Sequence, residues 1–120
     1  MFQHRNVDAL RPLKPVELEL LLALVDEERH GYGLVQRIAE QTDDLIRLEP
    51  GNLYRVIKRL LDAGLVQESG RRPVENGEER RRYYRLTAPG MRVLAAELHR
   101  LRAVLAGAPA RALARRLRMT

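Results

Sequence analysis

The segment from Pro50 to Val66 constrains the fold more than any other part of the sequence. Its apolar residues recur at helical spacing and predict a buried stripe: Leu53, Val56, Ile57, Leu60 and Leu61. The other side is polar and carries three cations: Asn52, Arg55, Lys58, Arg59 and Asp62. Pro50 and Gly51 mark the start, and Gly64 stands where a helix end favours a residue that tolerates positive φ. We therefore expect a helix over about 51–63, followed directly by a strand.

A helix buried on one face and bearing Arg, Lys and Asn on the other has the chemistry needed in a DNA major groove. There Arg and Lys pair with guanine acceptors, Asn pairs with adenine, and either cation can contact phosphate. An ordinary amphipathic helix with a solvated basic face is the alternative for this segment alone. The segments around it favour DNA recognition.

Composition narrows the classes of protein to which the chain can belong. Its 120 residues indicate one domain, and 22 Lys and Arg against 16 Asp and Glu give a net charge of +6, which favours a polyanionic partner. The absence of Cys excludes disulfides, thiolate metal sites and a Cys nucleophile. No apolar run approaches the roughly 20 residues that span a bilayer, and the N-terminus is too polar for a signal peptide. We expect a cytoplasmic protein with no membrane partner.

The other elements follow from local periodicity and turn residues. They are expected in this order: an arm over 1–13, a helix over about 15–25 that is apolar nearly all round, a turn over 30–33, a helix over 34–41, a polar connector over 42–49 with an extended piece at 46–48, and strands over 65–69 and 82–86. Between the two strands, residues 70–81 contain Gly, Pro, Asn-Gly and many charges, which is typical of a hairpin tip. Tyr83 and Tyr84 fit strand packing better than base stacking.

A last long helix is expected over 88–106, with Thr87 as its N-cap. Its apolar residues step by three and four, as in a coiled-coil seam: Met91, Leu94, Leu98, Leu101 and Leu105. We interpret this seam as the dimer interface; the alternative is that it belongs to the core of one chain. Beyond Gly107 and Pro109, residues 108–120 are expected to form a basic tail with four arginines.

Three helices followed by a hairpin with a basic tip is the order of a winged helix-turn-helix domain. In that fold the third helix enters the major groove and the hairpin, or wing, lies along the DNA backbone. The wing is rich in arginine: Arg71, Arg72, Arg80, Arg81, Arg82 and Arg85. Such side chains would neutralise phosphates and give salt-dependent affinity. A solvated charged loop is the alternative.

Four motifs in this order resemble the PadR transcriptional regulators over about residues 14–106. They are His30-Gly-Tyr-Gly-Leu34, Gly51-Asn-Leu-Tyr54, Arg59-Leu-Leu-Asp-Ala-Gly-Leu65 and Arg82-Tyr-Tyr-Arg-Leu-Thr87. The resemblance implies a winged-helix repressor that dimerises through its C-terminal region. A single helix after the wing would place the chain in the short PadR subfamily.

The resemblance also implies roles for particular residues. Tyr54 and Lys58 would lie near DNA, and Tyr32 would face the same groove edge from the start of the second helix. Asn52 departs from the family pattern, in which a small hydroxyl residue is more frequent there, so its base preference stays open. Family members respond to phenolic acids and drugs, but this sequence has no Trp to stack on an aromatic drug.

No catalytic constellation competes with this interpretation. His4, His30 and His99 are far apart in the sequence and fit no metal-binding spacing. His30 fits a capping or hydrogen-bonding role better, and Gly31 and Gly33 lack the Gly-Lys-Ser/Thr of a phosphate loop. We therefore expect no enzyme activity, no metal and no cofactor.

The sequence thus predicts a mainly α-helical protein with a small β-hairpin. Its parts are an arm (1–13), a winged helix-turn-helix domain (14–87), a dimerisation helix (88–107) and a basic tail (108–120). We expect a homodimer that binds an inverted-repeat operator in double-stranded DNA, represses transcription and can be released by a small-molecule effector. The expected DNA contacts are Tyr32, Asn52, Tyr54, Arg55, Lys58, Arg59, Arg72, Arg80, Arg81 and Arg82. A protein-interaction adaptor is the main alternative, and a small hydrolase is a second one.

Overall fold

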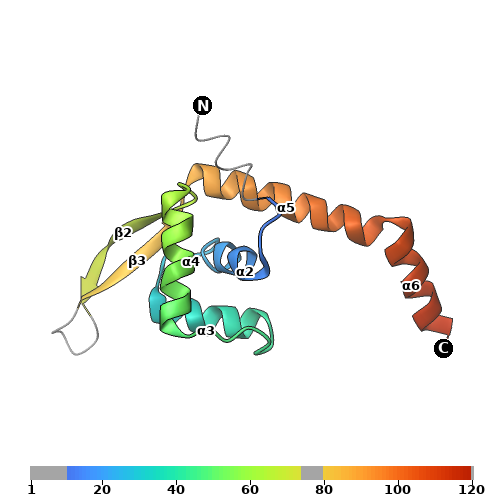
Figure 1. The fold of residues 1–120 in the computed structure, drawn as a ribbon, viewed down its shortest axis with the longest axis horizontal. Coiled ribbons are helices and arrows are strands. Elements are labelled where there is room, and N and C mark those ends of the chain that lie inside the picture. Colours follow the sequence, from blue (N-terminus) through green and yellow to red (C-terminus); the bar gives the residue numbers. More distant parts are fainter. Residues whose placement is uncertain (1–10, 74–79, 120) are drawn as a thin grey trace.

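A computed structural model describes residues 11–73 and 80–119, and it has the order of a winged helix-turn-helix domain (Figure 1). The elements are α2 (Pro15–Ala23), β1 (Arg29–His30), α3 (Gly31–Gln41), α4 (Pro50–Asp62), β2 (Val66–Pro73), β3 (Arg80–Leu86), α5 (Ala88–Ala106) and α6 (Ala108–Met119). Helices α2, α3 and α4 form the helical body, and β2 and β3 form the wing. The predicted fold class is confirmed.

The core lies where α2, α3 and α4 meet the base of the wing and the first half of α5. Its most deeply buried apolar side chains are Leu20, Leu21, Leu34, Ile38, Leu53, Ile57, Leu60 and Leu65. The stripe predicted on α4 is therefore the face that packs inward, and its polar face is left toward solvent. Within the described part of the chain, no helix has both the length and the apolar character to cross a membrane.

The expected helix boundaries around the wing are confirmed by their capping residues. Helix α4 begins at Pro50, and Gly64 follows its end with φ of +78°, a backbone conformation that glycine adopts without strain. The Thr87 hydroxyl accepts a hydrogen bond from the Gly90 amide at the start of α5 and donates one to the Gly64 carbonyl. One residue thus caps α5 and fastens it to the turn that ends α4.

The wing has a third strand that the sequence pattern did not predict. The sheet order is β1-β3-β2, all antiparallel, with Arg29 opposite Tyr84 and His30 opposite Tyr83. The predicted turn over 30–33 was wrong, because β1 ends at His30 and α3 begins at Gly31. Residues 46–48 belong to no strand. The extra strand joins the start of α3 directly to the wing.

Gly90 explains how closely α5 approaches the end of α4. A Cβ atom at this position would lie 2.1 Å from the Leu65 carbonyl oxygen, which is far inside contact distance. The first turn of α5 therefore rests on the backbone of Leu65, and the Thr87 amide donates a hydrogen bond to the same carbonyl at 3.1 Å. Only glycine fits here without displacing the helix.

Helices α5 and α6 make the molecule elongated. The radius of gyration is 16.9 Å, whereas a compact chain of this length has about 14 Å. Figure 1 shows the second half of α5 leaving the body and α6 continuing beyond it at an angle. The expected unstructured tail was wrong, because residues 108–119 form α6 and the chain has two helices after the wing. Gly107 ends α5, as predicted.

Candidate nucleic-acid interface

Helix α4 presents its polar face to solvent. Asn52, Tyr54, Arg55 and Lys58 are all exposed, while Leu53 and Ile57 on the opposite face are buried. Lys58 Nζ lies 3.1 Å from Asp62 Oδ2, one turn further along the helix. Arg55 has no ion-pair partner among the described residues. Four of the predicted DNA contacts therefore stand together on one accessible helix face.

Arg59 differs from its neighbours on the same helix. Its Nε lies 3.1 Å from Glu17 Oε2, and the Glu17 side chain is almost completely buried at the start of α2. The other Glu17 oxygen accepts a hydrogen bond from the Lys14 amide at 2.8 Å. Arg59 thus compensates a buried carboxylate inside the protein, which gives it a structural role that the sequence pattern did not reveal.

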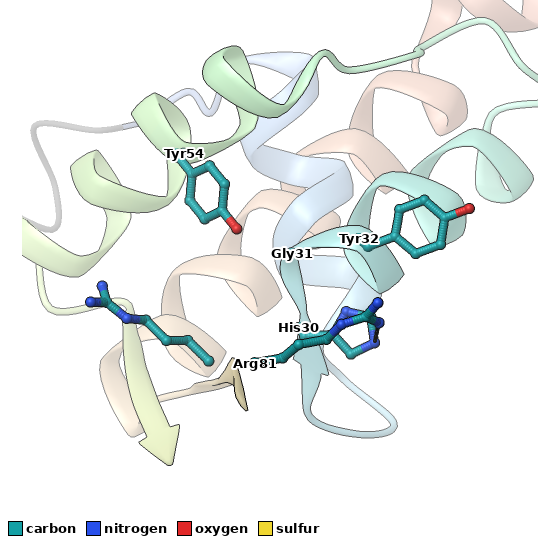
Figure 2. A pocket seen from close by; sticks show the side chains of 6 residues that line it. His30, Gly31, Tyr32, Tyr54 and Arg81 are labelled. Carbon is teal, nitrogen blue, oxygen red and sulfur yellow. Dashed lines mark hydrogen bonds between the residues drawn. The ribbon is translucent and has the colours of Figure 1, made fainter. Parts of the chain in front are cut away.

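A cavity of about 530 Å³ separates α4 from the start of α3 and the wing. It is lined by His30, Gly31, Tyr32, Tyr54, Arg81 and Arg82. Figure 2 shows Tyr54 pointing from α4 toward Gly31, with Tyr32 and Arg81 on the other side of the opening. The structure therefore brings together four residues that were predicted as DNA contacts from three separate segments.

Gly31 explains the position of Tyr54. A Cβ atom at residue 31 would lie 2.9 Å from the Tyr54 hydroxyl oxygen, closer than a normal contact. The absence of a side chain on the first residue of α3 thus makes room for the tyrosine ring. Although Tyr54 packs there, 54% of its surface remains exposed. Gly31 and Tyr54 belong to two of the motifs singled out in the sequence, and this contact joins them.

His30 connects the helix start to the wing, and its predicted capping role is confirmed. Its Nδ1 accepts a hydrogen bond from the Gly33 amide at 3.1 Å, and its ring meets the Tyr83 ring edge-on at 5.2 Å between centroids. Arg81 Nη1 lies 3.1 Å from the other ring nitrogen. Burial, and then the nearby Arg81 charge, lower the pKa of His30 below its usual value. The imidazole is therefore neutral at pH 7.

The wing arginines are paired with carboxylates from neighbouring elements. Arg72 forms an ion pair with Glu28 and lies over the Tyr83 ring, 4.1 Å from its centroid. The Ser69 hydrogen bond, together with Arg72, lowers the pKa of Glu28. Arg82 lies 4.0 Å from Glu68. The side chain of Arg80 lies outside the described residues.

Arg81 has a different place from the other wing arginines. Its guanidinium carbon lies 5.9 Å from the centre of the Tyr32 ring and borders the cavity beside α4. The wing and the helix-turn-helix therefore form one continuous surface at this point. Tyr32 is itself exposed, so a cation and an aromatic ring stand together at the edge of that surface.

The seam predicted on α5 divides into two parts. Leu94 is only 3% exposed and packs in the core with Val93, so its assignment to a dimer interface was wrong. Its three-four spacing serves the core of the protomer instead. Met91, Leu98 and Leu105 are exposed and Leu101 is half-buried. The outer half of the helix therefore keeps an apolar face in water.

Glu97 is a buried carboxylate that the sequence pattern did not single out. It is 1% exposed and accepts hydrogen bonds from the Leu13 amide at 2.6 Å and from the guanidinium groups of Arg11 and Arg100. These bonds, Arg100 first, lower the pKa of Glu97 from 4.5 to about 2. Glu97 thereby ties the segment before α2 to the middle of α5.

Comparison with known proteins yields a family match that covers most of this surface. A sequence model of the family described as "Transcriptional regulator PadR-like family" matches residues 20–96. A curated relative, uncharacterized protein X from Lysinibacillus sphaericus, is 30% identical over 71 residues, or 59% of this chain and 63% of that protein. The match thus spans less than two thirds of that relative.

Several solved structures share the fold. A transcriptional regulator from Clostridium thermocellum is 26% identical with a TM-score of 0.62, over 81% of this chain and 87% of that one. Bacillus subtilis PadR in complex with operator DNA is 21% identical with a TM-score of 0.62, over 72% and 48% of the two chains. A PadR family regulator from Clostridium difficile is 22% identical with a TM-score of 0.66, over 76% and 91%.

Proposed function

Because the chain belongs to the PadR-like family of transcriptional regulators, whose members are not enzymes, we propose that it acts by binding specific sequences in duplex DNA. The observation that carries the proposal is the continuous surface formed by the exposed face of α4, the Tyr32–Tyr54 cavity and Arg81 of the wing. Bacillus subtilis PadR, which shares the fold, has been solved with operator DNA.

In this proposal α4 enters the major groove and the wing follows the backbone. Asn52, Arg55 and Lys58 would meet base edges or phosphates from the helix, since their side chains are exposed on one face. Arg81 and Arg82 would approach phosphates flanking the groove. Tyr54 would sit between the two sets of contacts, at the position that Gly31 leaves open for its ring.

Arg59 and Arg72 would contribute less than their charge suggests. Arg59 neutralises the buried Glu17, and taking it away would leave that carboxylate without compensation in the interior. Arg72 would have to leave Glu28 before it could contact a phosphate. We therefore expect phosphate affinity to come more from Arg81 and Arg82 than from these two residues.

We further propose that the protein is a homodimer that represses transcription from an inverted-repeat operator. The exposed apolar side chains Met91, Leu98 and Leu105 on α5, with half-buried Leu101, would be covered by a second copy. Two recognition helices related by a twofold axis would then reach half-sites about one helical turn apart. A small-molecule effector bound between the α5 helices would shift the spacing if it favoured one arrangement over the other.

Selection of bound sequences from a random DNA pool tests this function. We expect an enriched palindromic sequence, bound with an affinity that falls steeply as salt rises. Replacing both Arg81 and Arg82 with Gln should flatten the slope of log K against log salt by roughly one unit per lost phosphate contact. An adaptor that uses the winged helix only to bind proteins would enrich no sequence.

A further inference from the structure

Helix α6 lies beyond the matched family region and has two chemically different faces. Its apolar face consists of Leu113 and Leu117, one turn apart, with Ala110 beside them. Leu113 is 58% exposed and Leu117 is 67% exposed. On the opposite face three arginines repeat at intervals of four and three residues: Arg111, Arg115 and Arg118. Arg116 lies at the flank of the leucine face, within reach of whatever covers it.

A groove of matching chemistry lies on the helical body, between α2, α3 and α5. Its volume is about 620 Å³, and Leu22, Val25 and Leu98 form its apolar lining. Glu19 and Asp26 stand at its rim, and Val25 and Leu98 are exposed although they are apolar. The groove is therefore a hydrophobic surface with carboxylates at its edge, which suits an apolar helix flanked by cations.

The charges of the groove and of α6 are complementary. Arg37, the basic residue of the groove, is already engaged, because it lies 3.8 Å from Asp26 and 4.0 Å from Glu40. Glu19 accepts a hydrogen bond from the Gln41 side chain at 2.9 Å but has no cation within ion-pair distance among the described residues. The arginines of α6 likewise have no carboxylate within that distance in the described chain. Glu19 and Arg116 can therefore satisfy each other across an interface.

The occupant of the groove is a second copy of the chain. Figure 1 shows that α6 projects away from the body of its own protomer, so it does not cover its own groove. Leu98 belongs both to the groove and to the exposed face of α5. If two α5 helices pair antiparallel along that face, the helix that follows Gly107 in one copy reaches the body of the other near its Leu98.

We propose that α6 is an exchanged arm, which docks Leu113 and Leu117 into the α2–α3–α5 groove of a second copy with Arg116 facing Glu19. This inference rests on the proposed dimer and adds to it a second contact outside the α5 face. It assigns a binding role to a helix that the family match does not include. It also explains why Val25, at the end of α2, is left exposed beside an apolar groove.

Disulfide trapping between single-cysteine variants tests the arm directly, because the natural sequence contains no cysteine. Full-length Val25→Cys and Leu113→Cys proteins, one carrying a size tag, are mixed and oxidised. Both positions are exposed, so neither substitution disturbs the core. We expect a mixed disulfide dimer of tagged and untagged chains. The matched control pairs Val25→Cys with Arg115→Cys, on the opposite face of α6, and should form several-fold less of it.

Equal trapping at residues 113 and 115, or none at either, would overturn the exchanged arm. Charge reversal gives an independent measurement: Arg116→Glu should raise the dimer dissociation constant about tenfold, the range expected for one close charge pair. Adding Glu19→Arg to the same chain should restore it. Failure of that rescue counts against the proposal. Loss of DNA affinity when Arg111, Arg115 and Arg118 become Gln, with no trapping at 113, would show α6 to be a DNA contact instead.

The outcome is separable from the proposed DNA-binding function. DNA binding by the wild-type protein is measured in the selection experiment, which does not involve α6. A palindrome without trapping removes only the exchanged arm. Trapping without an enriched sequence removes the DNA-binding function and leaves the arm in place.

Discussion

Replacing Glu97 with Gln should destabilise the protein strongly, because this carboxylate is charged in the interior of the fold. It holds the Leu13 amide, Arg11 and Arg100 at 2.6 to 3.3 Å. Its pKa falls from 4.5 to about 2 on folding, and each pKa unit corresponds to about 1.36 kcal/mol. The charged form therefore contributes at most about 3 kcal/mol to the free energy of unfolding at pH 7.

The pH dependence has a defined direction. Since the folded pKa lies below the unfolded one, the stabilisation is complete above pH 4.5 and is lost as the pH falls toward 2. Between pH 6 and pH 3 the difference in stability between wild type and Glu97→Gln should shrink by about 2 kcal/mol. Urea unfolding followed by circular dichroism, at one fixed protein concentration and a series of pH values, measures both quantities.

Asp62→Asn provides the matched control. Asp62 also lies 3.1 Å from a cation, but both partners in its pair with Lys58 are exposed. Exposed pairs of this kind contribute about 0.5 kcal/mol or less. A Glu97→Gln protein as stable as wild type at pH 7, or one whose deficit is unchanged at pH 3, would show that the buried charge does not hold the two segments together.

Three further predictions concern backbone fit, the α4 surface and the α5 surface. Gly90→Ala should destabilise by more than about 3 kcal/mol because its Cβ would meet the Leu65 carbonyl at 2.1 Å, whereas Gly51→Ala, with open space around it, should be neutral or stabilising in thermal melts. Arg55→Ala and Lys58→Ala should each cost about 1–3 kcal/mol of operator affinity in fluorescence titrations while the melting temperature stays unchanged. Leu98→Glu should make the protein monomeric at micromolar concentration in light scattering, and a variant that remains dimeric would contradict the α5 interface.

Local signals were sufficient for the elements that begin and end at distinctive residues. Pro50 and Gly64 defined α4, and Thr87 defined the start of α5, because caps and positive φ act within a few residues. The apolar stripe of α4 also showed which face is buried. Its exposed face, and with it most of the candidate interface, followed from the same periodicity.

Tertiary contacts account for what local patterns missed. Strand β1 has two residues, too few for an alternating pattern, and exists because Arg29 and His30 pair with β3. Leu94 and Leu98 share one spacing, yet the first packs in the core and the second does not. The partner segment of Glu97 lies 84 residues earlier. For α6, Ala, Leu and Arg are strong helix formers and Pro109 stands in the first turn, where proline is tolerated; this local signal was overlooked.

The pairing of basic residues in the isolated protein determines how DNA affinity should arise. Arg72 pairs with Glu28, Arg82 lies near Glu68 and Lys58 lies near Asp62, so part of the positive charge is neutralised within the chain. Contact with phosphate would replace these pairs rather than add to them, and affinity would depend on the difference between the two. Exposed pairs are weak, whereas several phosphate contacts act together and release counterions. The acidic residues beside the wing would therefore reduce nonspecific binding more than operator binding, where base contacts from α4 supply the additional free energy.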